Sequence, residues 1–292
     1  MNTKDLENRV DNEKLSFILI KPDGMNNLVM LEDLASQVEL FGLSIVDTCK
    51  FIFKKEYIKS LWPSHYVCPL TSALLNKYLT GYELKVLVLE GEDSITKTNK
   101  IKSYIRQKYS LGAFSNCIHT PSNLSELKSQ LEFIFRITGK DIHFSKHNNS
   151  STDFNPNSNP NTNPLLGIWG RFADLGEEIL SDVVEKVWNL GKNNGWENLW
   201  SYTIPPDEAY VKLHVDYKNS IAYVCSCLYE LFTYWEPERV LITVLEVDRT
   251  GSLIIASGKY NDMASKAIKL REMGLISELI PNIQNELVNQ YL

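Results

Sequence analysis

The feature that most constrains the fold is a stretch of asparagine and proline near the middle of the chain. Residues 148–164 read NNSSTDFNPNSNPNTNP, in which Phe154 is the one large apolar side chain. Asparagine and proline favour turns and extended backbone, and a segment with so little to bury cannot contribute to a packed core. We therefore expect a folded domain at residues 1–140, a flexible linker at 141–166, and a second domain at 167–292.

Composition and charge limit the classes of function open to the chain. With 43% hydrophobic and 23% charged residues, it has the composition of an ordinary globular protein. A net charge of −6 disfavours a general nucleic-acid binder. The chain lacks an apolar run of about 20 residues, so we expect no membrane association. The N-terminal residues lack the apolar core of a signal peptide, which predicts a cytoplasmic protein.

The cysteines predict free thiols rather than disulfides or a metal site. They are odd in number and scattered, which is typical of a reducing compartment. Cys225 and Cys227 lack a second cysteine or histidine pair at zinc spacing. The five are Cys49, Cys68, Cys117, Cys225 and Cys227.

The first domain is predicted to be an α+β sandwich. Its apolar patterns alternate between short buried runs and helical spacing, in the order β-α-β-β-α-β of a ferredoxin-like fold. Ser122 is the expected N-cap of the last helix. The expected strands are 15–20, 43–53, 84–89 and 115–119, and the expected helices are 28–41, two short ones within 55–78, 94–107 and 122–135.

The second domain is predicted to be a smaller α+β domain. Asp248-Arg249-Thr250-Gly251 lies between two apolar runs and is a hairpin signal. Asp174, Glu178 and Asp182 share one helical face, where a solvated acidic surface is favoured over a carboxylate site. His214 and Asp216 are similarly favoured as a satisfied surface pair. The expected helices are 171–190, 219–235, 262–273 and 276–291, and the expected hairpin strands are 240–247 and 252–257.

Four polar residues of the first domain have the chemistry for phosphoryl transfer. The imidazole of His119 is a good nucleophile near neutral pH and a good leaving group once phosphorylated. Lys21 and Arg106 can stabilise phosphate charge, and the amide of Asn116 can donate to and accept from ribose hydroxyls. Each residue taken alone also has a structural interpretation, as a core histidine, a solvated lysine, a paired arginine or a strand-edge amide.

The joint order of motifs resembles a nucleoside diphosphate kinase domain over residues 15 to about 136. The resemblance implies phosphotransfer from ATP through a phosphohistidine at His119. It also implies Mg²⁺ bound with the ATP, a phosphate acceptor as second substrate, and a homo-oligomer. The supporting strings are FILIKPDG (17–24), FGLSIV (41–46), His65-Tyr66, Pro69-Leu70, LEG (89–91), Ile105-Arg106 and NCIH (116–119).

The same resemblance implies roles for the residues around the nucleophile. Lys21 and Tyr66 match positions that contact the sugar and phosphates or position the histidine. Arg106 matches a phosphate clamp, and Asn116 matches an amide that holds the ribose. The positions that sandwich the base fall at Leu70 and Leu74.

The chain departs from the family pattern in three places. Between Tyr66 and Pro69 it is a few residues short. The stretch between Gly91 and Arg106 is shorter and lacks a further phosphate-binding arginine. Lys100 or Lys97 could replace that arginine, although lysine lacks the bidentate fork.

The glutamate that normally orients the nucleophilic histidine falls at Gln130. Glu126 or Glu132 could supply the missing carboxylate instead. The sequence thus predicts an ATP-dependent phosphotransferase acting on a nucleoside diphosphate or related acceptor. Two alternatives stay open: a kinase for a non-nucleoside small molecule, and a nucleotide-binding sensor or scaffold that regulates the C-terminal domain.

Overall fold

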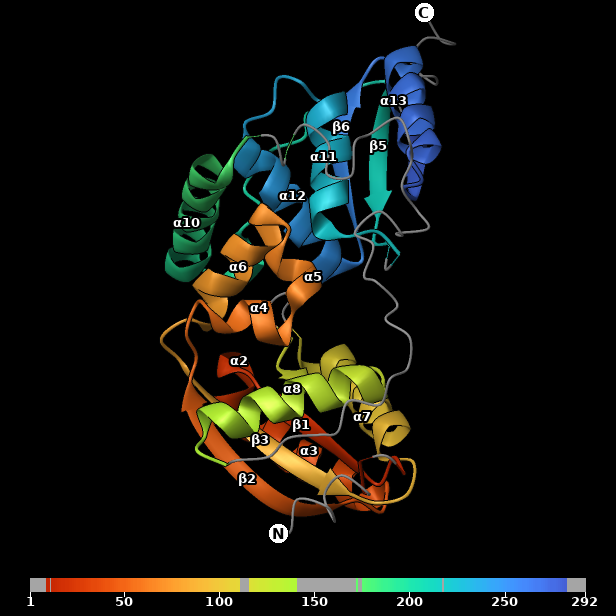
Figure 1. Cartoon of the computed structure of the whole chain (residues 1–292). Coiled ribbons are helices and arrows are strands. Elements are labelled where there is room, and N and C mark those ends of the chain that lie inside the picture. Colours follow the sequence, from red (N-terminus) through yellow and green to blue (C-terminus); the bar gives the residue numbers. More distant parts are fainter. Residues whose placement is uncertain are drawn as a thin grey trace, which may run out of the picture. The chain divides into compact units, whose positions relative to one another are not determined.

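The chain divides into two compact units, each described here by itself (Figure 1). The computed structural model describes residues 9–10, 12–110, 116–140, 172, 175–216 and 218–282. The first unit comprises Met1–Val67 and Leu75–Asp153, and the second comprises Cys68–Leu74 and Phe154–Leu292. The linker predicted at 141–166 lies outside the described residues. Cys68–Leu74, which the sequence assigned to the first domain, groups with the second unit.

The first unit has the predicted ferredoxin-like architecture. Its antiparallel sheet has the strand order β2-β3-β1-β4. The central strand β1 is buried along its whole length, which explains its unbroken apolar sequence LSFILI. The strands are β1 (Leu15–Ile20), β2 (Ser44–Ile52), β3 (Glu83–Glu90) and β4 (Ile118–His119). The long helices are α3 (Leu28–Leu40), α7 (Ser94–Tyr109) and α8 (Leu124–Ile137).

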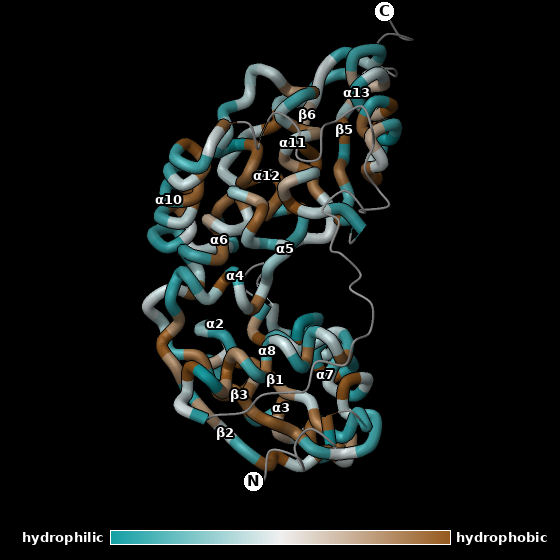
Figure 2. Tube along the Cα trace, viewed as in Figure 1, coloured by the Kyte–Doolittle hydropathy of each residue, from teal (hydrophilic) through white to brown (hydrophobic). Residues whose placement is uncertain are grey.

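The two faces of β1 have different neighbours. Ile18 and Ile20 belong to a core cluster with residues of α3 and α7. Phe17 and Leu19 point to the other face, because successive side chains of a strand alternate. Figure 1 shows α8 crossing the sheet, and Figure 2 shows the apolar residues concentrated along β1 and β3. His119 is the register partner of Leu19, so the pairing places its side chain on the same face as that leucine.

The segment between β2 and β3 differs from the sequence prediction. Two short helices were expected, but there are three: α4 (Tyr57–Leu61), α5 (Pro63–Tyr66) and α6 (Pro69–Leu79). Pro63 and Pro69 each begin a helix, since proline is favoured in the first turn and cannot continue a helix that precedes it. A further short helix, α2 (Pro22–Met25), follows β1.

The N-cap of α8 is Asn123 rather than the predicted Ser122. The side-chain oxygen of Asn123 accepts a hydrogen bond from the Glu126 backbone N–H at 2.9 Å. The backbone N–H of Ser122 instead donates to Glu126 Oε2 at 2.7 Å. Together these bonds form a relative of the capping box, one residue longer than usual.

The second unit is an α+β fold, as predicted. Its sheet is antiparallel with the order β6-β5-β7. The strands are β5 (Ala209–His214), β6 (Ser252–Gly258) and β7 (Ser277–Pro281). The helices are α10 (Glu177–Asn194), the 3₁₀-helix η1 (Trp196–Asn198), α11 (Ile221–Leu231), α12 (Pro237–Thr250) and α13 (Tyr260–Glu272).

Two elements predicted for this unit are wrong. The hairpin strand expected at 240–247 is part of helix α12, which starts at Pro237 and is capped by Gly251 with a φ of +81°. Seven residues of this helix between Val240 and Val247 are buried, so packing outweighs the strand preference of its β-branched side chains. The helix expected at 276–291 begins instead as strand β7, which pairs with β5, and residues 283–292 lie outside the described part.

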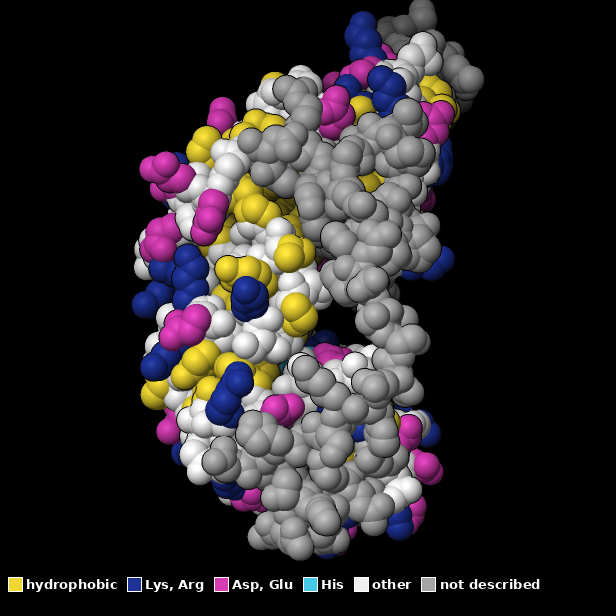
Figure 3. Space-filling view, in the orientation of Figure 1, with side chains coloured by type: hydrophobic (Ala, Val, Ile, Leu, Met, Phe, Trp, Pro, Cys, Tyr) yellow, Lys and Arg dark blue, Asp and Glu magenta, His cyan; other side chains and the backbone are white. Residues whose placement is uncertain are grey.

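The acidic face of α10 is exposed to solvent. Figure 3 shows acidic side chains gathered on this helix. Glu178 and Asp182 are both exposed, and Asp182 pairs with Lys186 one turn later at 2.7 Å. The predicted solvated surface therefore holds for these carboxylates, whereas Asp174 lies outside the described residues.

The predicted free thiols are confirmed, since all five cysteines are unbridged. The described residues contain no cluster of three or more histidine, cysteine or acidic side chains that could hold a metal ion. No helix in the described part of the chain is long and apolar enough to span a bilayer.

Candidate active site

Four of the predicted site residues converge at the carboxyl end of β1. Lys21 directly follows β1, and Arg106 lies in the last turn of α7. Asn116 precedes β4, and His119 ends it. Lys21 and His119 are 5% and 8% exposed, so both polar side chains are held almost entirely inside the first unit.

A tight turn places Asn116 beside Lys21. The Ile118 N–H donates to the Asn116 carbonyl oxygen at 2.6 Å, and Cys117 has a φ of 61°, the pattern of a γ-turn. The Lys21 backbone N–H holds the turn by donating to the Cys117 carbonyl oxygen at 2.8 Å. Such a conformation is strained for a residue other than glycine and persists where the surroundings over-determine it.

Asp23 and Gly24 support this turn from the side of β1. Asp23 Oδ2 accepts a hydrogen bond from the Cys117 N–H at 2.8 Å, and Asp23 Oδ1 accepts a short one from the Tyr78 hydroxyl. A side chain at position 24 has no space, because its Cβ would lie 2.7 Å from the Cys117 carbonyl oxygen. The Lys-Pro-Asp-Gly segment therefore anchors the turn that carries Asn116.

The Lys21 ammonium group is enclosed by polar and aromatic side chains. Its Nζ donates to Asn116 Oδ1 at 2.5 Å and lies 5.8 Å and 5.6 Å from the ring centres of Trp62 and Tyr78. Burial and, after it, the charge of Arg106 lower the pKa of Lys21 from 10.5 to about 7. A buried anion next to Lys21 would offset both effects, which makes this lysine a receptor for negative charge.

Arg106 uses one edge of its guanidinium to bind the backbone of β4. Its Nε and Nη2 donate to the Ile118 carbonyl oxygen at 3.1 Å and 2.8 Å. Lys102, one turn earlier on α7, donates from Nζ to Asn99 Oδ1 at 2.6 Å. Burial lowers the pKa of Lys102 from 10.5 to about 8, with Arg106 as the next cause. Two cations of α7 are thus held at the same face of the helix.

Lys102, which the sequence interpretation did not single out, lies at the candidate site, whereas the predicted Lys100 does not. Lys100 is exposed, and two residues of helix separate it from Lys102 by about 200° around the axis. The charge of Lys102 lowers the pKa of His119. The spacing of Asn99, Lys102 and Arg106, at i, i+3 and i+7, is the sequence signal that could have identified this face.

The His119 ring is held by Gln130 of α8, the position where the family pattern has a glutamate. His119 Nε2 and Gln130 Oε1 are 3.0 Å apart. Gln130 Nε2 donates to the Leu61 carbonyl oxygen at 2.6 Å and to Glu126 Oε1 at 2.9 Å. Both partners of the amide nitrogen are acceptors, so the amide orientation is fixed with its oxygen toward His119.

This arrangement determines the tautomer of His119. Because Gln130 presents an oxygen, His119 Nε2 carries the proton and donates it, and Nδ1 is the unprotonated nitrogen. Burial holds the pKa of His119 well below its ordinary value of 6.5. The hydrogen bond to Gln130 raises this pKa, and the charge of nearby Lys21 lowers it. The imidazole is therefore neutral near pH 7 with its lone pair on Nδ1.

Trp62, which the sequence interpretation missed, contacts that lone pair. The Trp62 indole N–H points to His119 Nδ1 with Nε1 3.4 Å away, and the two rings meet edge to face at 5.2 Å. The predicted Tyr66 is instead 44% exposed, with Lys59 over its ring. Trp62 lies four residues before Tyr66, one helical turn, and the shortened segment after Tyr66 was the available signal for such a shift.

The predicted base-binding leucines do not offer an open surface. Leu70 and Leu74 are 0% and 2% exposed, and they belong to Cys68–Leu74, which groups with the second unit. The Cys68 thiol lies near Cys225, whose pKa is raised well above 9.0 by burial first and then by Cys68. Side chains with so little accessible surface do not form an open slot, and the base-binding role of Leu70 and Leu74 stays a prediction.

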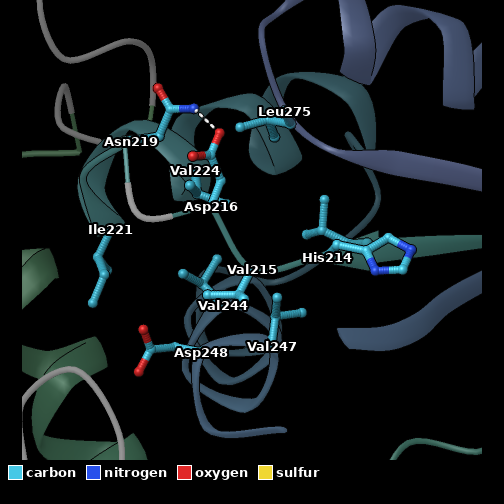
Figure 4. Close-up of a pocket in the computed structure, with 11 residues that line it drawn as sticks. His214, Val215, Asp216, Asn219, Ile221, Val224, Val244, Val247, Asp248 and Leu275 are labelled. Atoms are coloured by element: carbon cyan, nitrogen blue, oxygen red, sulfur yellow. Dashed lines mark hydrogen bonds between the residues drawn. The ribbon is translucent and has the colours of Figure 1, made fainter. Parts of the chain in front are cut away.

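A small cavity in the second unit borders His214 and Asp216 (Figure 4). Its volume of about 40 Å³ has room for a few water molecules, not for a nucleotide. Asp216 Oδ2 accepts a hydrogen bond from Asn219 at 2.7 Å, and His214 Nε2 lies 3.2 Å from the Glu278 carboxylate. Both polar groups have partners, in agreement with the satisfied pair expected from the sequence.

Comparisons with known proteins find matches over the N-terminal part of the chain. The model of the family described as nucleoside diphosphate kinase matches residues 14–139. A nucleoside diphosphate kinase of Hydrogenovibrio crunogenus is 23% identical, covering 41% of this chain and 91% of that protein. One from Clostridium perfringens strain 13 is 27% identical, covering 41% of this chain and 90% of that protein.

Solved structures give matches over the same part of the chain. The nucleoside diphosphate kinase of Aquifex aeolicus is 21% identical with a TM-score of 0.36, covering 42% of this chain and 94% of its own. The NDP kinase of Pyrobaculum aerophilum is 18% identical with a TM-score of 0.36, covering 42% and 96%. Residues 14–139 are thus the part of the chain that matches the nucleoside diphosphate kinase family model.

Proposed function

We propose that the first unit transfers the γ-phosphate of ATP through a phosphohistidine at His119 to a nucleoside diphosphate or related acceptor. The observation that carries the proposal is the state of His119, a neutral imidazole with an unprotonated Nδ1 next to three cations. A neutral imidazole needs no prior deprotonation before it attacks phosphorus. The cations are Lys21, Lys102 and Arg106, each named among the causes that lower the pKa of His119.

These cations suit the charge that develops during transfer. Charge in phosphoryl transfer spreads over the three equatorial oxygens, and fixed cations stabilise it without reorganising. Lys21 and Lys102 act as point charges, and Arg106 presents a planar group for phosphate oxygens. Asn116, held by Lys21, has the amide suited to ribose hydroxyls. Magnesium enters as part of the MgATP substrate, bound through the phosphates of the nucleotide.

The test is phosphorylation of the purified full chain with radiolabelled ATP and Mg²⁺. Wild type is expected to acquire acid-labile, alkali-stable label, since phosphohistidine has that stability. His119→Ala is expected to lose the label, and His214→Ala, in the second unit, is expected to keep it. Absence of label on wild type that still binds nucleotide would refute the proposal. Discharge of the label by a panel of nucleoside diphosphates and small alcohols or acids then identifies the acceptor class.

A second candidate function is nucleotide binding without turnover, in the service of the second unit. The Trp62 indole occupies the Nδ1 lone pair, and Gln130 is uncharged, so two features of the site disfavour fast chemistry. The labelling experiment separates the candidates, because this one requires binding in the absence of label.

The predicted homo-oligomer has one supporting observation. Helix α3 carries three large apolar side chains that are strongly exposed. They are Leu28, Val29 and Leu40, at 73%, 65% and 74% exposure. Light scattering of the full chain tests the prediction, and a monomer at micromolar concentration would contradict it.

A further inference from the structure

We infer that Glu126 is a positioning residue for His119, acting through the amide of Gln130 as a carboxylate displaced by one helical turn. The inference rests on the proposed function and goes beyond it, since phosphotransfer through His119 requires no particular role for Glu126. It assigns a task to a residue outside the set that contacts substrate.

The geometry connects the two residues by an unbroken chain. His119 Nε2 donates to Gln130 Oε1 at 3.0 Å, and Gln130 Nε2 donates to Glu126 Oε1 at 2.9 Å. The same Glu126 oxygen lies 3.6 Å from His119 Nε2, within the range of a direct ion pair. Gln130 and Glu126 are four residues apart on α8, so they share one face of the helix.

The Glu126 carboxylate is itself fixed. Its Oε2 accepts from the Ser122 N–H at 2.7 Å, and its own backbone N–H binds Asn123 Oδ1 at 2.9 Å. Its side chain is 27% exposed, whereas Gln130 is 2% exposed. A capping motif at the start of α8 therefore holds a negative charge toward the interior of the site.

The Glu126 carboxylate can stabilise the positive charge that the His119 ring acquires during phosphoryl transfer. The Nδ1 lone pair forms the bond to the γ-phosphorus, and the bond from phosphorus to the bridging oxygen breaks with its electron pair leaving on the diphosphate. The Nε2 proton stays in place, so the ring becomes a phosphorylated imidazolium with a positive charge. Hydrogen bonds in series polarise one another, so the carboxylate strengthens the bond from Nε2 to Gln130 as that charge appears.

The positive charges around His119 increase the need for a carboxylate near its ring. The cations named above, from the end of β1 and from α7, disfavour a positive ring. Among the described residues, Glu126 of α8 has its carboxylate within ion-pair distance of His119. The site thus needs a negative charge on the Nε2 side, and an uncharged Gln130 does not supply it alone.

The experiment relocates the carboxylate along α8 in the full chain. Glu126→Gln is expected to lower the initial rate of His119 labelling by ATP at least about tenfold, which corresponds to about 1.4 kcal/mol in the barrier. The double variant Glu126→Gln, Gln130→Glu restores a carboxylate next to Nε2 and is expected to recover most of the rate. Glu132→Gln, two residues beyond Gln130 on the same helix, is the matched control and is expected to label like wild type.

A second readout does not depend on turnover. In nucleotide-free wild type, nitrogen-15 spectra of the histidine rings are expected to show His119 protonated on Nε2 only. The Leu61 carbonyl still orients Gln130 in Glu126→Gln, so the tautomer is expected to persist, while the Nε2 proton resonance moves upfield as its hydrogen bond weakens.

The outcomes distinguish the inference from the proposed function. Unlabelled wild type refutes phosphotransfer, and the Nε2 resonance then tests the link to Glu126 on its own. Wild-type labelling by Glu126→Gln, an unmoved resonance, or a double variant that fails to recover with its tautomer intact would each overturn the role assigned to Glu126.

Discussion

Lys21 provides the sharpest thermodynamic test of the site, because its burial carries a calculable cost. Its folded-state pKa of about 7 lies well below the ordinary 10.5. Above pH 10.5 the lysine is neutral in both states and contributes nothing. Between about pH 10.5 and 7 the unfolded chain binds a proton that the folded chain does not, so stability falls as the pH falls. At pH 7 the accumulated cost is about 4 kcal/mol.

Lys21→Met removes that cost and also removes one bond. The methionine is apolar and of similar length, so the cavity stays filled. The lost hydrogen bond to Asn116 offsets about 2 kcal/mol of the gain, as is typical of a bond from a charged group. The variant is therefore expected to be more stable than wild type by about 2 kcal/mol at pH 7. Near pH 9 the cost has fallen to about 2 kcal/mol. The folded lysine is then neutral and its bond to Asn116 contributes about 1 kcal/mol, so the advantage of the variant should shrink to about 1 kcal/mol.

The assay is urea unfolding of the nucleotide-free chain at pH 7, 8 and 9. Hydrogen exchange of peptides from β1 and β3, read by mass spectrometry, reports the first unit separately from the second. Lys100→Met, at an exposed position on α7, is the control and should change stability by less than about 0.5 kcal/mol. Parallel stability curves for wild type and Lys21→Met across this pH range, or a less stable variant at pH 7, would refute the electrostatic reasoning.

Three further substitutions test other parts of the site. Lys102→Ala should weaken ATP binding about tenfold in calorimetry by removing a half-buried cation, and Lys100→Ala should leave the affinity unchanged. Equal effects of the two substitutions would contradict the assignment of Lys102. Trp62→Phe keeps an aromatic ring but removes the N–H that points to His119 Nδ1. His119 should then label about fivefold faster, which is the equivalent of one hydrogen bond of about 1 kcal/mol. A slower rate would show that the indole assists transfer. Gly24→Ala should lower the free energy of unfolding by about 1–3 kcal/mol in urea titrations, because its Cβ would meet the Cys117 carbonyl oxygen at 2.7 Å; an unchanged midpoint would mean that the turn can shift freely.

Local patterns were sufficient for the strands and the long helices of the first unit. The apolar run of β1 and the helical spacing of α3, α7 and α8 each reflect a period imposed by one buried face. The same reasoning failed at 240–247, where β-branched residues predicted a strand. That segment is buried along most of α12, and a helix surrounded by apolar neighbours loses the amphipathic period by which it is recognised.

Some features of the candidate site could be predicted from the sequence, and others could not. The sequence by itself singled out His119, Lys21, Arg106 and Asn116 as candidate site residues, because each belongs to a motif that is local in the chain. Only the tertiary structure decided that Trp62 meets Nδ1 and that Glu126 reaches His119 through Gln130. Those contacts join residues 57 and 11 positions apart. Which side chain meets which across such separations depends on strand register and helix rotation, and these are set by the packing of the whole unit.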